Sequence, residues 1–199
     1  MIFHARSLAA SAILATAIAA PGLAQAAADD SGSGFRPLLG FQLTTGGDNL
    51  AKAEFTDGSS TTIRAGALVN VYGGAEYRFN GAPFAVQGSI GYHFHNASAD
   101  NGSIRFERFP IELVGLWSPA QEFRLGLGLR YAAGARLVSS GAADIGSFDF
   151  KSSIAPLAMA EWLVTPSNGL QLRYVHETFK LNGISFDGSH VGLGYNYYF

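Results

Sequence analysis

The sequence contains no cysteine and little charge of either sign. The lack of cysteine excludes a disulfide framework and any thiolate metal site. Charged residues make up 14% of the chain, against about 25% in an ordinary soluble domain. The three lysines are Lys52, Lys151 and Lys180, whereas water-exposed sheets usually carry lysine over their faces and edges. With a net charge of −2, the chain also lacks the basic surface that a nucleic-acid partner requires.

The N-terminal region has the features of an export signal, and no later stretch is long and apolar enough for a transmembrane helix. Arg6 precedes an apolar run at 8–20, and Ala24-Gln25-Ala26 forms a small-residue cleavage site. The run is shorter than the about 20 residues that an uncleaved membrane anchor needs. We therefore expect a signal peptide at 1–26, a flexible mature N-terminus at 27–34 and one folded domain at 35–199.

The rest of the chain alternates apolar and polar residues with a period of two, which indicates β-strands with two different faces. Ile104 and Phe106 change parity relative to Ile111 and Leu113. We therefore expect a β-bulge at Phe109–Pro110, because proline cannot donate to the ladder, and a similar one near Pro156. The pattern predicts eight strands, at 36–46, 66–79, 84–95, 104–117, 122–136, 148–163, 170–181 and 189–199.

The connections between these strands alternate in length. Three are short and rich in Asn, Gly, Pro and Ser, which supply turn dihedrals, at 80–83, 118–121 and 165–169. Four are longer and polar, at 47–65, 96–103, 137–147 and 182–188. Short turns at one end and long loops at the other are typical of outer-membrane barrels. The predicted fold is all-β, an eight-stranded antiparallel up-and-down transmembrane β-barrel.

The alternation by itself allows the apolar face to point inward or outward. A soluble, lipocalin-like periplasmic carrier would point it inward, and a membrane barrel points it at lipid. The polar face is rich in Gly, Arg and Glu, which suits a narrow packed interior, and aromatic residues gather near both strand ends, as in interfacial girdles. Together with the shortage of lysine, these features favour the membrane barrel and leave the carrier as the weaker alternative.

The C-terminal stretch Leu193-Gly-Tyr-Asn-Tyr-Tyr-Phe199 completes a family resemblance. With the export signal and the four hairpins, it resembles the small outer-membrane β-barrel superfamily, the OmpA/OmpX/OmpW-like proteins. In that group alternate C-terminal aromatics, here Tyr195, Tyr197 and Phe199, resemble the signal read by the barrel-assembly machinery. The resemblance implies an outer-membrane location after signal cleavage, with contacts to membrane lipids and lipopolysaccharide. It implies no single function, because these barrels serve adhesion, structural, channel and enzymatic roles.

Nine charged residues fall on the polar faces and are expected to line the lumen. An unpaired charge in a narrow interior is costly, so their near balance of sign favours a structural salt-bridge network. A polar pore is the alternative, although eight strands enclose a space only just wide enough for their own side chains. The predicted network consists of Glu76, Arg78, Glu112, Glu122, Arg124, Arg130, Glu161, Arg173 and Glu177.

Four histidines were weighed for metal and acid–base chemistry: His93, His95, His176 and His190. A His93–His95 metal site lacks an evident third ligand, so neither a metal nor a cofactor is expected. His176 and Thr178 faintly resemble the His-x-Ser stretch of lipid A deacylases, with Thr in place of Ser and no clear acidic partner. The sequence therefore predicts a non-enzymatic barrel with a structural or surface-interaction role, whose loop partner the sequence does not name. Alternatives are a narrow channel for small or apolar solutes and a lipid A-modifying hydrolase.

Overall fold

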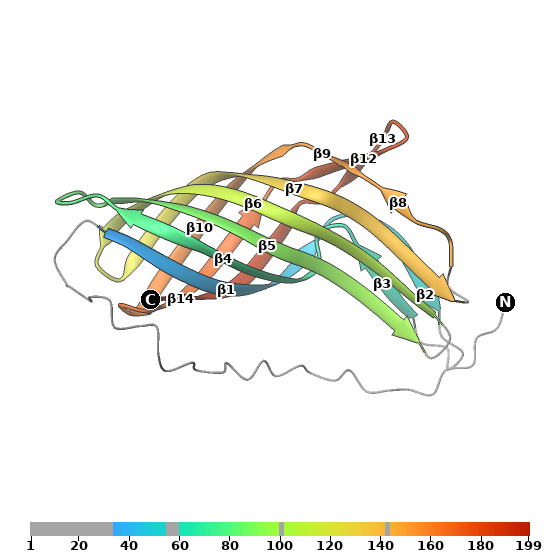
Figure 1. The fold of residues 1–199 in the computed structure, drawn as a ribbon, viewed down its shortest axis with the longest axis horizontal. Coiled ribbons are helices and arrows are strands. Elements are labelled where there is room, and N and C mark those ends of the chain that lie inside the picture. The colour runs from blue at the N-terminus through green and yellow to red at the C-terminus, as the bar shows by residue number, and fades with distance from the viewer. Residues whose placement is uncertain (1–33, 55–59, 100–101, 142–143) are drawn as a thin grey trace.

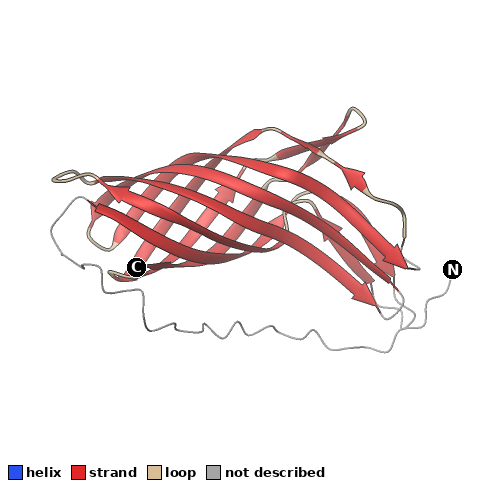
Figure 2. Ribbon diagram, viewed as in Figure 1, coloured by secondary structure: helices blue, strands red, loops and turns tan. Residues whose placement is uncertain are grey.

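The computed structural model describes residues 34–54, 60–99, 102–141 and 144–199. The expected signal peptide and the mature N-terminus up to residue 33 lie outside the described residues. Long strands cross one another obliquely, and the connections lie at their two ends (Figure 2). In chain order the long strands are β1 (Gly34–Gly46), β4 (Leu68–Arg78), β5 (Phe84–Ala99), β6 (Gly102–Ala120), β7 (Phe123–Gly141), β10 (Ile154–Thr165), β11 (Asn168–Val175) and β14 (His190–Tyr198).

The eight long strands close into an antiparallel barrel. Their order is β10-β11-β14-β1-β4-β5-β6-β7, and β7 pairs back onto β10. Each strand lies beside its neighbours in the chain, so the topology is up-and-down. The short turns lie at one end with the C-terminus, at the left of Figure 1, and the longer connections lie at the other end. The predicted fold class is confirmed.

The long connections contain more β-structure than the sequence predicted. They hold β2 (Asn49–Glu54), β3 (Ser60–Arg64) and β13 (Ile184–Asp187), whereas β8 (Phe148–Asp149), β9 (Lys151–Ser152) and β12 (Thr178–Leu181) fall within the predicted strands at 148–163 and 170–181, which the structure interrupts. The predicted strand at 170–181 is interrupted after Val175, and its outer part, β12, forms a three-stranded sheet with β13 and β9. Asn182 and Gly183 join β12 to β13 with φ of 51° and 85°, as a tight hairpin turn requires.

The expected bulge at Pro110 is wrong. Ile104, Phe106 and Pro110 are all buried on the lumen side of β6, so the strand keeps one parity throughout. What changes along β6 is the chemistry of its inner face, which becomes apolar toward the loops. The extra residue lies instead on β7, where the ladder shifts between Glu107 and Phe109.

Glycine makes the bulge on β7 feasible. Opposite the shift, Gly134 has a φ of 59°, a left-handed conformation that side chains disfavour.

The expected bulge near Pro156 is also wrong, because the ladder is regular there. On β10 the shift lies between Leu163 and Thr165.

The outer wall of the barrel is apolar. Large side chains such as Leu127 and Leu193 are 75% and 67% exposed. Each would gain about 1.5–3 kcal/mol on moving from water into an apolar phase, so a wall of this kind is stable in lipid and not in water. No helix in the described part of the chain is long and apolar enough to cross a membrane. The membrane assignment of the apolar face is therefore confirmed over the soluble carrier.

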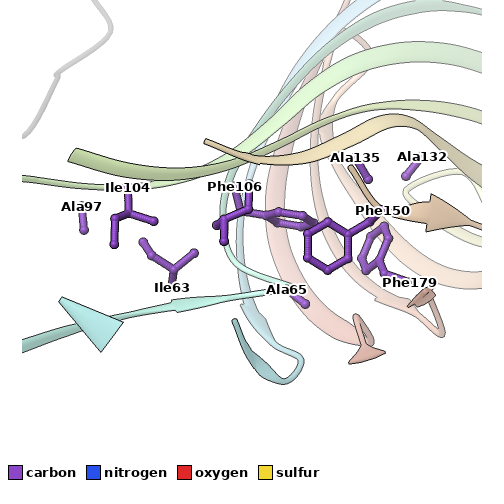
Figure 3. Packing of buried hydrophobic residues seen from close by; sticks show 10 residues of the cluster. Ile63, Ala65, Ala97, Ile104, Phe106, Ala132, Ala135, Phe150 and Phe179 are labelled. Carbon is purple, nitrogen blue, oxygen red and sulfur yellow. The ribbon is translucent and has the colours of Figure 1, made fainter. Parts of the chain in front are cut away.

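The interior is filled, and its filling changes along the axis. Near the turns, Leu38, Tyr72, Leu163 and Tyr198 pack together. Near the loops, a larger outer core brings together residues of β3, β5, β6, β7, β12 and the segment before β9. Figure 3 shows Phe106, Phe150 and Phe179 at its centre, with edge-to-face ring contacts at 5.4 to 6.5 Å. A third apolar cluster includes Leu116, Leu157 and Met159. Charged side chains lie among these clusters, and Arg124 is 4.8 Å from the ring centre of Tyr198.

Candidate functional site

A turn-side network of charges is centred on Arg124, which β7 directs into the lumen. Its guanidinium donates to Glu76 of β4 and to Glu161 of β10, with Nε 2.9 Å from Glu161 Oε2. Glu161 also accepts hydrogen bonds from the Tyr198 hydroxyl at 2.9 Å and the Asn196 amide at 2.7 Å. Charge-assisted hydrogen bonds of this kind are the strongest in proteins. The network therefore clamps strands from opposite sides of the barrel.

A loop-side network is centred on Arg130, six residues further along β7. Arg130 donates to Glu112 at 2.9 Å and to Glu177 at 3.2 Å. Arg173 of β11 also donates to Glu112. Arg108 is fully buried beside them, but its nearest carboxylate, Glu177, is 3.8 Å away. The loop-side network is therefore less completely paired than the turn-side one.

His93 joins the loop-side network through both ring nitrogens. Its Nδ1 lies 2.9 Å from Arg130, and its Nε2 lies 2.9 Å from the Thr44 hydroxyl and 3.2 Å from Arg108. The ring of His190 packs edge-on against it at 5.3 Å. These contacts use His93 as a hydrogen-bonding member of the lumen wall.

The other lumen histidines also hold polar contacts. His190 donates from Nδ1 to the Gly188 carbonyl at 2.8 Å, and His95 accepts a backbone hydrogen bond from Arg64 at 3.1 Å. Within the described ranges, no three His, Asp or Glu side chains are arranged to hold a metal ion. The geometry of these three lumen histidines is that of structural hydrogen bonding.

Two of the predicted lumen charges lie outside the buried networks. Glu122 is exposed in the short turn before β7. Arg78 is 38% exposed at the turn-side mouth, where it donates to Glu76 at 2.6 Å. The structure buries the other predicted charges, Glu76, Glu112, Arg124, Arg130, Glu161, Arg173 and Glu177. Buried arginine and glutamate are therefore nearly balanced inside the barrel, as desolvated charges must be.

The sequence reasoning missed Arg108 because the bulge expected at Phe109–Pro110 would have changed the parity of β6. Uninterrupted alternation from Glu112 back to Ile104 would have placed Arg108 in the lumen. The sequence analysis also assigned no role to several amide side chains that point into the lumen. Gln171 donates to Asn196 at 3.1 Å. Asn196 in turn accepts from the Tyr72 hydroxyl at 2.5 Å.

Several buried polar atoms in the described lumen make no hydrogen bond to another protein atom. They include Oε1 and Nε2 of Gln87, Nε and Nη1 of Arg108, Oε2 of Glu177 and Nε2 of His190. Buried polar atoms of this kind usually bind ordered water. Arg108 and Glu177 belong to the loop-side network, which is therefore the less completely hydrogen-bonded of the two.

The candidate catalytic pair is not brought together by the structure. His176 is exposed at the outer rim, and its Nδ1 lies 2.9 Å from the hydroxyl of Ser189, not from Thr178. Hydrogen bonds from the Ser189 hydroxyl and backbone N–H lower the pKa of Asp187. A triad needs its acid to orient the histidine, whereas Asp187 binds the serine. The arrangement holds the start of β14 against the end of β11.

The C-terminal aromatics lie on the outer wall near the turns. Tyr195 packs against Phe41 of β1 at 5.9 Å, and Tyr197 meets Phe199 edge-to-face at 4.9 Å. Main-chain pairing of β14 with both β1 and β11 places this segment at the seam that joins the two ends of the chain. Closure of the barrel therefore depends on the last strand.

Comparison with known proteins agrees on the fold. No protein-family model matches the sequence, and no curated protein matches it. The structure is similar to Ail, the attachment invasion locus protein of Yersinia pestis, with a TM-score of 0.54 and 17% identity over 83% of this chain and 97% of Ail. It is also similar to Neisserial surface protein A, with a TM-score of 0.50 and 13% identity over 85% of this chain and 100% of that one.

The closed barrel, its apolar wall and these structural likenesses define the class of protein. The chain is a small eight-stranded β-barrel of the Gram-negative outer membrane. At this identity the likeness shows the fold alone.

Proposed function

We propose that this barrel is a non-enzymatic, non-conducting outer-membrane protein with a structural and surface-interaction role. The observation that carries the proposal is the filled lumen. Three apolar clusters and two charge networks together occupy the lumen from the turns to the loops. A solute would have to displace all of them, since eight strands leave no free bore.

Planar-bilayer recording of the purified protein tests the closed lumen. We expect no unitary conductance steps, with a general porin in the same bilayers as the positive control. Arg124→Met is the informative variant, because Arg124 holds the turn-side network together. Unitary steps in the wild-type protein that Arg124→Met abolishes or resizes would instead establish the narrow channel.

Lipid analysis tests the absence of enzyme activity. Asp187 binds Ser189 and leaves His176 without an orienting acid, so we expect lipid A from expressing cells to keep all its acyl chains. Acyl loss that His176→Ala or Ser189→Ala stops would favour the hydrolase.

The biogenesis of the protein is proposed from its two ends. Residues 1–26 act as a cleaved signal peptide, which N-terminal sequencing of the mature protein tests. The outward row Tyr195, Tyr197 and Phe199 acts as the signal for the barrel-assembly machinery. Phe199→Ala should lower the fraction of heat-modifiable barrel in outer membranes, whereas Phe35→Ala, another exposed aromatic near the turns, should not.

In the membrane, the barrel wall contacts phospholipid and lipopolysaccharide. The outer connections face the medium, where loops commonly carry recognition. The hairpins β2–β3 and β12–β13 give these connections fixed shapes, which suits a binding surface. A pull-down with intact cells that display the protein on their surface would identify the partner of these connections.

A further inference from the structure

Two of the three lysines of this chain lie directly opposite each other. Lys151 of β9 and Lys180 of β12 are paired in the antiparallel register, and Lys180 is paired in turn with Ser185 of β13. Directly paired residues share one face of a sheet. The three side chains therefore form a continuous row, which we call the lysine row, and all three residues are exposed.

The lysine row points away from the barrel interior. The chain neighbours Phe150 and Phe179 are buried in the outer core, with their rings 6.5 Å apart. Strand alternation then turns Lys151 and Lys180 to the opposite side. Because the aromatic core holds the backbone from below, the two ammonium groups are presented on a fixed support.

Like charges directly opposite in a sheet destabilise it, and the protein does not relieve this pair. Neither lysine side chain has an ion pair or hydrogen bond in the described part of the chain. The acidic side chains nearest in sequence and register are engaged elsewhere. Asp149 accepts from Arg136 at 2.6 Å, and Asp187 accepts from the Ser189 N–H at 2.9 Å. An anion from outside the chain would relieve the repulsion.

The height of the row above the apolar wall indicates which anion is available. Ile154, which is 68% exposed and paired with Tyr131, ends the apolar surface on this side. Lys151 lies three residues earlier in the chain, toward the loops, roughly 10 Å at about 3.3 Å per residue. A strand tilt of about 40° reduces this to roughly 7–8 Å, the level of the headgroups just outside the hydrocarbon.

We propose that the lysine row binds a phosphate group of lipopolysaccharide in the outer leaflet. Two ammonium groups supply charge, and the Ser185 hydroxyl supplies a neutral hydrogen bond to the same phosphate. The inference rests on the proposed contact between the barrel wall and lipopolysaccharide, and it adds the site and the chemical group recognised.

Binding of lipid A to the mature protein in phospholipid nanodiscs tests the proposal. The probes are diphosphoryl lipid A and the same lipid after phosphatase treatment. For diphosphoryl lipid A, the double variant Lys151→Gln/Lys180→Gln should raise Kd roughly 10- to 30-fold, since each lysine near an anionic surface contributes about five-fold. The matched control Arg64→Gln/Arg105→Gln removes two exposed charges of the outer region elsewhere and should change Kd less than about two-fold.

Each outcome decides the matter once heat-modifiability has shown that all variants form the barrel. Weakening by both double variants alike would mean diffuse charge attraction and would overturn the site. Equal binding of the dephosphorylated lipid would overturn phosphate recognition. Binding of inorganic phosphate at the lysine row without any binding of lipid A would overturn the lipid assignment. Conductance by the wild-type protein would refute the closed lumen and leave this site untouched.

Discussion

Replacing Arg124 by methionine removes the cation that two buried carboxylates share. Arg124 is 2% exposed, and Glu76 and Glu161 are fully buried. Its guanidinium also lies 4.8 Å from the ring centre of Tyr198. Breaking a buried pair leaves an uncompensated charge and costs about 3–5 kcal/mol. Because two carboxylates lose their partner here, we expect the upper part of that range for Arg124→Met.

Arg108 is the matched comparison, because it is equally buried on the same kind of strand. Its nearest carboxylate is 3.8 Å away, and its Nε and Nη1 atoms make no hydrogen bond in the described structure. Its guanidinium lies 5.0 and 5.7 Å from the rings of Phe106 and Phe179, contacts that a methionine thioether also makes well. We therefore expect Arg108→Met to change stability by less than about 1 kcal/mol in either direction.

Reversible urea unfolding from lipid vesicles, followed by tryptophan fluorescence, measures both free energies of unfolding. The triple variant Arg124→Met/Glu76→Gln/Glu161→Gln serves as a rescue, since neutral partners remove the uncompensated charge. It should recover at least about half of the loss seen in Arg124→Met. A cost for Arg108→Met equal to that of Arg124→Met, or no recovery in the triple variant, would refute the argument that pairing quality decides stability in this lumen.

Three further predictions concern the wall, the bulge and the rim. Leu127→Arg, at the middle of the lipid-facing wall, should destabilise the barrel by about 2–4 kcal/mol in the same assay. Ile145→Arg, in the outer connection, should cost nearly nothing. Gly134→Ala forces a side chain into the left-handed region and should cost about 1–2 kcal/mol, whereas Gly88→Ala, whose added carbon meets nothing within 4 Å, should be neutral. The pKa of Asp187 is lowered in the folded protein. Its ionised carboxylate therefore stabilises the fold above the ordinary aspartate pKa of 3.8, and this stabilisation is lost as the pH falls through the lowered pKa. Unfolding midpoints of wild type and Asp187→Asn should therefore converge in acid, and a gap that persists at low pH would contradict this account.

Local patterns in the sequence carried the prediction of the barrel. Alternation over 122–136 separated Leu127 from Arg124 without any structure, because successive side chains of a strand point to opposite faces. The shortage of lysine then decided which face meets lipid. Most of the buried charges followed from the same alternation.

The prediction failed where a local signal competed with the alternation. Proline at 110 suggested a bulge and thereby hid Arg108, although the bulge formed on the partner strand at Gly134. A backbone irregularity belongs to a pair of strands, so one strand's sequence does not say which member takes the extra residue. The polar composition of the long connections likewise hid their hairpins.

What the sequence by itself determined is therefore the strand count, the two faces of each strand and the membrane setting. Only the tertiary structure decided which side chains meet. Arg124 reaches Glu76 and Glu161, which are 48 and 37 residues away in the chain, and Lys151 faces Lys180 across a small sheet built from two loops. The physical reason is that local strand geometry sets the face to which each side chain points. Which side chains contact each other depends on strand register, barrel closure and the fit of all side chains in the lumen.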